Sequence, residues 1–178
     1  MAIQEMILES PETPLGESAA TILIAEEDPN IREVLSDRLV LAGHRVLAAE
    51  DGLEALTVIR ETEPELVLLD VQIPRLDGFG VLRSISNEEL HTTVLVTAAN
   101  RTVHTAIEAL REGAFDLIVK PFMLDEVERR VDRALERTRL RRQNEDLMNE
   151  LTKTQEQIID EMEAELRAAH DMQLDLLP

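Results

Sequence analysis

Five short runs of apolar residues recur along the first two thirds of the chain, and their spacing limits the possible folds more than any other feature. They lie at residues 21–25, 45–49, 65–69, 92–96 and 115–119. Brief continuous apolar runs are typical of strands that are buried on both faces of a parallel sheet. The pattern therefore predicts five parallel strands.

Helical patterns separate these runs. Apolar residues that share one side of a helix form four groups: Ile31, Val34, Leu35, Leu39 and Ala42; Ala55, Leu56 and Ile59; Val81, Leu82 and Ile85; and Val103, Ala106, Ile107 and Leu110. Gly43 and Gly113 follow two of these groups, as glycine often follows a helix. Strands that alternate with helices favour right-handed crossovers and an α/β fold with a doubly wound sheet. We predict this domain over residues 21–135, after a flexible leader over residues 1–20.

The last third of the chain has a different character. Between Leu124 and Pro178 there is no Gly or Pro, which predicts one helix of about fifty residues, far longer than the usual globular helix of about 11–12. Residues spaced three or four apart form a seam along it: Leu140, Asn144, Leu147, Leu151, Thr154, Ile158, Met162, Leu166, Ala169, Gln173 and Leu176. This spacing predicts a coiled-coil linker over residues 136–178, with a stutter after Ile158.

The seam also bears on oligomeric state. Asn144 at a seam position favours a fixed register and two parallel strands, and so predicts a homodimer. The alternative is a solitary amphipathic helix that folds back on its own domain.

Composition excludes several classes of protein. The net charge is −19 and the pI is about 4.5, which opposes binding to phosphate backbones. The only aromatic residues are three Phe, so base-stacking platforms are lacking. There is no Cys, which fits a reducing cytoplasm, and no apolar run long enough for a membrane span. We expect a cytoplasmic protein that binds neither nucleic acid nor membrane.

Polar residues follow the ends of four predicted strands. Glu26, Glu27 and Asp28 follow the first, Asp70 the third, Thr97 the fourth and Lys120 the fifth. Because the carboxyl ends of parallel strands meet at one edge, these side chains should lie together. Oxygen ligands suit Mg²⁺. A carboxylate beside that cation can attack a phosphoryl group, while an ammonium group neutralises the phosphoryl oxygens.

The residues at these strand ends resemble four motifs of bacterial response-regulator receiver domains. They are ILIAEEDPNIR at 22–32, LVLLDVQIPRLDG at 66–78, VLVTA at 94–98, and GAFD at 113–116 with KPF at 120–122. The resemblance covers about residues 21–135. It implies a flavodoxin-like receiver that is phosphorylated by a histidine kinase or a phosphotransfer protein.

The resemblance also implies a role for each residue. Asp70 would be the phosphorylated nucleophile, and Thr97 and Lys120 would bind the phosphoryl group. Mg²⁺ would be bound by Asp70, by Glu27 directly, by Glu26 mainly through water, and by the backbone carbonyl of Gln72. The Lys120–Pro121 bond would be cis.

Two features, the acidic pair and the residue at position 117, depart from the family pattern. Receivers usually have Asp at one or both positions of the acidic pair, whereas Glu26 and Glu27 are longer, so Asp28 is an alternative for one of these contacts. Leu117 lies where receivers commonly have Tyr or Phe as a switch coupled to Thr97. A degenerate receiver that is never phosphorylated and acts as a constitutive dimerisation module is therefore the second hypothesis.

The end of the chain, ELRAAHDMQLDLLP at 165–178, resembles a second pattern. PPM-type serine/threonine phosphatases that follow bacterial sensor modules often begin with Ala-x-x-(Ile/Met)-Gln-x-x-Leu-Leu-Pro. This implies that the chain is a regulatory fragment, not itself an enzyme, that ends where a phosphatase domain begins. Another output enzyme, such as a nucleotide cyclase, is the alternative, and a DNA-binding output is less attractive.

Overall fold

The computed structural model describes residues 19–99 and 103–175. Five parallel strands form a single sheet in the order β2-β1-β3-β4-β5. The strands are β1 (Thr21–Ala25), β2 (Arg45–Ala49), β3 (Leu66–Asp70), β4 (Thr93–Ala98) and β5 (Asp116–Val119). The predicted five-stranded parallel sheet is confirmed. Residues 1–18 of the predicted leader lie outside the described residues.

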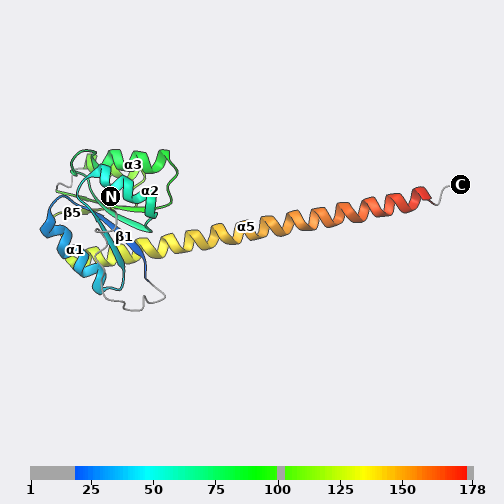
Figure 1. Cartoon of the computed structure of the whole chain (residues 1–178), viewed down its shortest axis with the longest axis horizontal. Helices are drawn as coiled ribbons and strands as arrows, with labels where there is room; N and C mark the ends of the chain where they lie inside the picture. Colours follow the sequence, from blue (N-terminus) through cyan, green and yellow to red (C-terminus); the bar gives the residue numbers. More distant parts are fainter. Residues whose placement is uncertain (1–18, 100–102, 176–178) are drawn as a thin grey trace, which may run out of the picture. The chain divides into compact units, whose positions relative to one another are not determined.

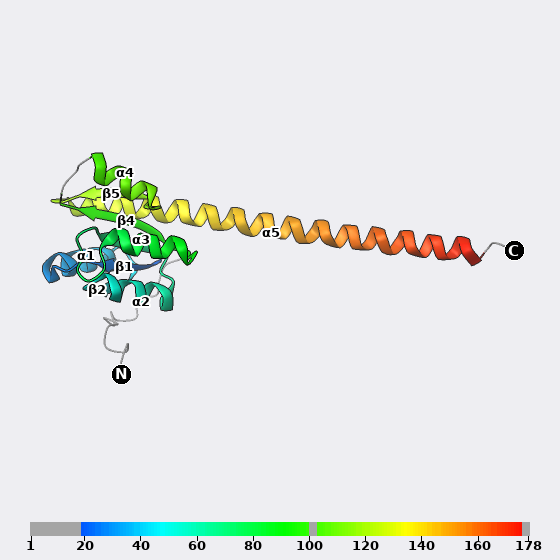
Figure 2. The same ribbon diagram turned by 90° about the horizontal axis from the view of Figure 1, so that it is seen from above.

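Helices cover both faces of the sheet (Figure 1). They are α1 (Pro29–Leu41), α2 (Gly52–Thr62), α3 (Gly78–Asn87), α4 (Val103–Arg111) and α5 (Leu124–Asp175). One apolar cluster joins α2, α3 and α4 to the sheet, and a second joins α1 and the start of α5 to the opposite face. Figure 2 looks onto the first layer, with α3 between α2 and α4. The sheet is therefore doubly wound, as predicted.

Aspartates fix the starts of three helices. Asp28, Asp51 and Asp77 are the N-caps of α1, α2 and α3, and each side chain accepts a hydrogen bond from a backbone N–H of the first turn. Such caps satisfy donors that a helix leaves without an internal partner. Each of the three caps lies between the end of a strand and the next helix, on the side of the sheet where the strands end.

The side of α4 that faces the sheet differs from the predicted one. Ile107 and Leu110 are 47% and 56% exposed, whereas Ala109 is fully buried. The helix is thus turned by about one residue from its predicted orientation, because the small Ala109 occupies the contact with the sheet. Val34 of α1 is also about half exposed. Periodicity therefore gave the correct helices but not every buried position.

Helix α5 is continuous over 52 residues, as the sequence predicts. Val127, Val131, Ala134 and Leu135 are buried against the sheet, and the first compact unit of the chain ends at Thr138. The second unit begins at Arg139, and every described side chain from Leu140 to Leu174 is exposed. The coiled coil stays a prediction. Within the part of the chain that the structure describes, no helix is both long and apolar enough to cross a membrane.

Candidate functional site

Four residues of the predicted site lie at the carboxyl edge of the sheet. Glu26 directly follows β1, Asp70 ends β3, and Lys120 directly follows β5. Thr97 of β4 lies opposite Asp70 in the parallel register. Three of these residues are almost completely buried, with exposed fractions of 3% for Glu26, 6% for Asp70 and 4% for Thr97.

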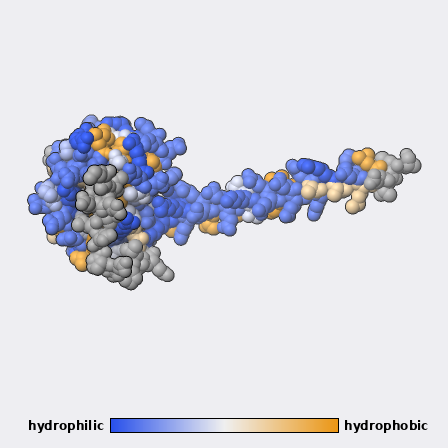
Figure 3. All heavy atoms as spheres, viewed as in Figure 1, coloured by the Kyte–Doolittle hydropathy of each residue, from blue (hydrophilic) through white to orange (hydrophobic). Residues whose placement is uncertain are grey.

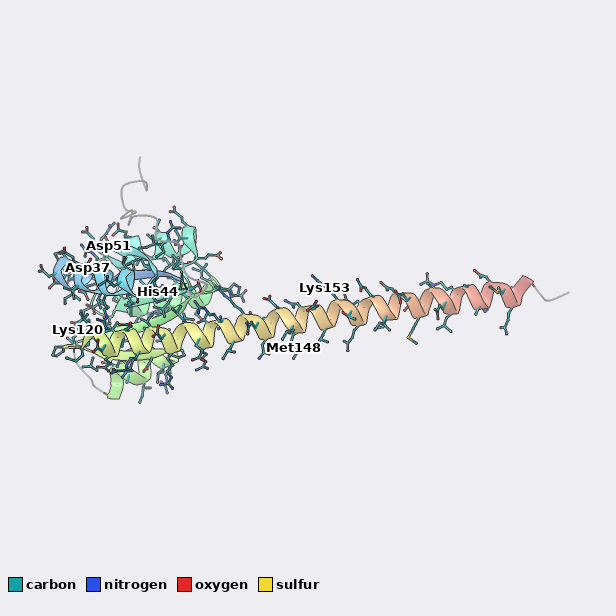
Figure 4. All side chains as sticks on the ribbon, turned by 90° about the horizontal axis from the view of Figure 1, so that it is seen from below. Asp37, His44, Asp51, Lys120, Met148 and Lys153 are labelled. Atoms are coloured by element: carbon teal, nitrogen blue, oxygen red, sulfur yellow. The ribbon has the colours of Figure 1, made fainter. Side chains whose placement is uncertain are left out.

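Lys120 joins the two carboxylates (Figure 4 labels this residue). Its Nζ donates hydrogen bonds to Oε2 of Glu26 and to Oδ2 of Asp70, each at 2.6 Å. Burial disfavours the ammonium form, but the hydrogen bonds to Asp70 and Glu26 outweigh this, and the pKa of Lys120 is raised above 10.5. Lys120 is therefore charged at neutral pH and offsets two buried negative charges. The Lys120–Pro121 bond is cis, as the family resemblance implies.

The loop between β3 and α3 holds Asp70 from the other side. Oδ1 of Asp70 accepts a hydrogen bond from the backbone N–H of Gln72 at 3.0 Å. Val71, which lies between Asp70 and Gln72, donates its N–H to the carbonyl of Thr97 at 2.9 Å. The carbonyl of Val71 accepts a hydrogen bond from the N–H of Gly78 at 3.0 Å. Both oxygens of the predicted phosphoacceptor are therefore oriented before any ligand binds.

The two members of the acidic pair differ in environment. Glu26 is buried, and its Oε1 accepts from the N–H of Asp28 at 3.1 Å, while Glu27 is exposed. The Asp28 carboxylate caps α1, and hydrogen bonds from the backbone of Asn30, then Ile31, lower its pKa. That engagement with the helix makes Asp28 a poorer candidate for a metal ligand than Glu26 or Glu27.

The donors at this edge fit a hard cation. Glu26 and Asp70 offer carboxylate oxygens only, and the main chain of Gln72 adjoins them, a set that suits Mg²⁺ with several retained waters. Among the described residues, however, no three acidic or His side chains are already gathered as a metal site. Glu27 would have to turn inward to complete the set.

Leu117 occupies the predicted switch position in β5. It is partly buried and packs on the apolar cluster beneath α2, α3 and α4. Its backbone N–H is bound by Asp116, whose carboxylate also accepts a hydrogen bond from Arg130 of α5 at 2.6 Å. An apolar side chain there has no hydroxyl with which to bind Thr97.

Sequence reasoning missed two arginines that contact the loops of the site. Arg32 Nη1 donates to the carbonyl oxygens of Glu26 and Glu27. Arg75, in the loop after Asp70, donates to Oδ2 of Asp51 at 2.9 Å. Arg32 lies within the receiver motif at 22–32, but its contact with the two carbonyl oxygens depends on how the chain folds.

A parallel sheet of this order, with a buried Asp, an acidic pair and a Lys at its carboxyl edge, is typical of a phosphoacceptor signal receiver. Residues 22–132 match the response regulator receiver domain, and the chain belongs to this family. It is therefore a response-regulator receiver of two-component signalling.

Curated relatives support the same family. The chain is 40% identical over 115 residues to the regulatory protein AtoC of Escherichia coli, which covers 65% of this chain and 25% of that protein. It is 40% identical over 117 residues to the probable transcriptional regulator ycf27 of Cyanophora paradoxa, covering 66% and 48% respectively. The chain thus spans about half or less of these two relatives.

Solved structures agree. NtrX from Brucella abortus is 35% identical with a TM-score of 0.68, over 72% of this chain and 30% of that chain. The Francisella response regulator 1452 receiver domain is 29% identical with a TM-score of 0.65, over 67% and 98%. Receivers interact with histidine kinases or phosphotransfer proteins. The two curated relatives are named as regulatory or transcriptional proteins, and the phosphatase output remains a prediction.

Proposed function

We propose that this receiver accepts a phosphoryl group on Asp70 from a histidine kinase or a phosphotransfer protein. The observation that carries the proposal is the contact of Lys120 Nζ with both Asp70 and Glu26 at 2.6 Å. It aligns a buried nucleophile, a counter-charge and a second carboxylate without any ligand.

The residues would act as follows. An Asp70 carboxylate oxygen forms the new bond to phosphorus, while the bond from phosphorus to the donor breaks and the donor keeps the electron pair. Lys120 neutralises a phosphoryl oxygen, and the Thr97 hydroxyl donates a hydrogen bond to another.

Mg²⁺ would be held by Asp70, Glu26, Glu27 and the carbonyl of Gln72, and would supply further charge neutralisation. Because the Lys120 ammonium already contacts both buried carboxylates, it must share them with the cation.

The test is phosphorylation by acetyl phosphate, followed by intact-protein mass spectrometry. We expect a gain of one phosphoryl group that requires Mg²⁺ and is lost in Asp70→Asn. Asp37→Asn is the matched control, because Asp37 is an exposed residue of α1. No mass gain in the wild-type chain, or the same gain in Asp70→Asn, refutes the proposal.

A degenerate receiver is the second candidate, because Glu27 is exposed rather than gathered with Glu26 and Asp70. It would form a constant dimer whether or not a phosphoryl mimic is present. Sedimentation with and without beryllofluoride separates the two functions: a change in oligomeric state or shape favours the first, and a constant dimer without phosphorylation favours the second.

The output would leave through the helical linker, which would pair with a second copy of the chain. Separate hydrophobic residues lie among the hydrophilic ones along the surface of this segment (Figure 3). Leu140, Leu147, Leu151 and Ile158 are each at least half exposed and follow the seam with Asn144 among them. Their pairing would remove apolar surface from water and align two receivers in parallel.

The absence of Cys allows a clean test of this pairing. Leu147→Cys, at a seam position, should form an intermolecular disulfide on mild oxidation, because a parallel register brings the two residues together. Lys153→Cys, which lies outside the seam of the same helix, is the control; Figure 4 labels this residue. Equal cross-linking of both variants would contradict the parallel dimer.

A PPM-type protein serine phosphatase following Pro178 is the proposed effector, supported by the motif at 165–178. A transcriptional output is the competing candidate, favoured by the names of the relatives. Sequencing the reading frame beyond Pro178 decides between them: an acidic metal-binding phosphatase domain supports the first, and a DNA-binding domain refutes it.

A further inference from the structure

The geometry points to Arg32 as a positioning residue for the acidic pair, an inference that rests on the proposed phosphorylation of Asp70. Arg32 lies in the first turns of α1, and only 17% of its side chain is exposed. Nη1 donates hydrogen bonds to the carbonyl oxygens of Glu26 and Glu27, the second at 3.2 Å. One guanidinium group therefore holds two successive peptide groups.

This contact addresses the added length of the two Glu side chains. A Glu has one more rotatable bond than an Asp, so more freedom is lost when its carboxylate is fixed around a cation. Hydrogen bonds from a charged donor are stronger than neutral ones, and the planar guanidinium group of Arg32, whose Nη1 donates both bonds, defines their direction. By fixing the main chain of both residues, Arg32 reduces the number of conformations open to the Glu27 side chain. It also keeps the Glu26 side chain directed at Lys120.

The segment between β2 and α2 also contacts Arg32 and the acidic pair. Oε1 of Glu50 lies 3.8 Å from Nη2 of Arg32, and Glu26 donates its N–H to the carbonyl of Ala49 at 3.1 Å. Because Glu50 is largely exposed, its ion pair is weak, and the two carbonyl contacts carry most of the effect.

The same segment reaches the other wall of the site. Gly52 donates its N–H to the carbonyl of Pro74 at 3.1 Å, and Asp51 binds Arg75 at 2.9 Å. The loop that carries the acidic pair and the loop that carries Gln72 therefore both contact the same short segment, residues 49–52. Groups that orient metal ligands in this way commonly change metal affinity by about 10- to 100-fold when they are removed.

The experiment compares two arginines of the same helix. Arg32→Gln removes the guanidinium group beside the acidic pair. Arg38→Gln is the matched control, because Arg38 also lies on α1 but binds Asp125 and Glu128 of α5 instead of the acidic pair. Binding of Mg²⁺ alone is measured by isothermal titration calorimetry, and urea unfolding without Mg²⁺ measures the structural cost of each variant.

We expect Arg32→Gln to raise the Mg²⁺ dissociation constant by about 10-fold or more, and Arg38→Gln to leave it within about twofold of wild type, whatever their effects on stability. Unchanged Mg²⁺ affinity in Arg32→Gln, or an equal loss in Arg38→Gln, overturns the inference. If Arg32→Gln does not fold, Arg32→Lys, which keeps the charge but not the planar guanidinium group, should weaken Mg²⁺ binding in the same direction, and wild-type affinity in that variant overturns the inference.

The phosphorylation assay distinguishes a failure of the positioning role of Arg32 from a failure of the proposed phosphorylation of Asp70. A wild-type chain that binds Mg²⁺ and is phosphorylated, with Arg32→Gln equal to it in Mg²⁺ affinity, refutes only the positioning role. A wild-type chain that neither binds Mg²⁺ nor gains a phosphoryl group refutes both.

Discussion

Gly52 should be intolerant of even one added methyl group. A Cβ at this position would lie 1.8 Å from the carbonyl oxygen of Leu76 and 2.8 Å from its carbonyl carbon. Ordinary contacts begin near 3.4 Å. In Gly52→Ala the loop between β3 and α3 must therefore move by more than an ångström, because the obstacle is backbone and cannot rotate away.

The cost can be worked out from these contacts. Overpacking of this kind costs about 1–3 kcal/mol, and loss of the hydrogen bond from Gly52 to Pro74 adds about 1 kcal/mol. We expect Gly52→Ala to lower the free energy of unfolding by about 2–4 kcal/mol. The Asp70 loop should shift with it, so phosphorylation should slow as well.

Gly43→Ala provides the contrast. Gly43 has a φ of +92°, but no atom lies within 4 Å of the place that an added methyl group would take. Its replacement costs only backbone strain, about 1–2 kcal/mol, and lies far from Asp70 in the chain.

The measurement is urea unfolding read by hydrogen exchange of peptides from β3, because the chain has no Trp or Tyr for fluorescence. Gly52→Ala should unfold at lower urea than Gly43→Ala and should be phosphorylated more slowly by acetyl phosphate. Equal stability of Gly52→Ala and wild type would refute the steric argument, and unchanged phosphorylation would refute the link between Gly52 and the site.

Three further predictions concern charge and hydrogen bonding. Lys120→Met leaves Glu26 and Asp70 buried without their counter-charge, so the free energy of unfolding should fall by about 3 kcal/mol and Mg²⁺ should restore part of it; urea unfolding with and without Mg²⁺ checks this. Because the folded pKa of Lys120 is raised above 10.5, its stabilisation should be complete below that pH and disappear as pH rises through the folded value; an alkaline unfolding profile identical in wild type and Lys120→Met would contradict this. Thr138→Val removes a 2.6 Å contact with Thr93 and should cost about 1 kcal/mol by thermal denaturation, with no change in phosphorylation.

Local patterns in the sequence were sufficient to predict the strands and helices. The predicted runs at 21–25 and 45–49 coincide with β1 and β2, and the run at 65–69 differs from β3 by one residue. Continuous apolar runs, glycines after helices and the absence of Gly and Pro beyond Leu124 act within a few residues of where they occur, so they can be read without the fold. Alternation of strands and helices then leaves few topologies.

The gathering of Glu26, Asp70, Thr97 and Lys120 at one edge was also predictable in outline. Parallel strands all end at the same side of a sheet, so residues that directly follow them must approach one another. The family motifs added roles for these residues. The roles themselves stay predictions until phosphorylation is measured.

Only the tertiary structure decided which side chains actually meet. Lys120 binds Glu26 and leaves Glu27 exposed, although the two glutamates are adjacent in the chain. Ala109 rather than Leu110 faces the sheet, and Arg32 turns to the carbonyls of the acidic pair. The physical reason is common to all three. Sequence patterns specify the period of an element, but its rotation and the direction of a long side chain are set by the volume and hydrogen-bonding groups of neighbours that are distant in sequence.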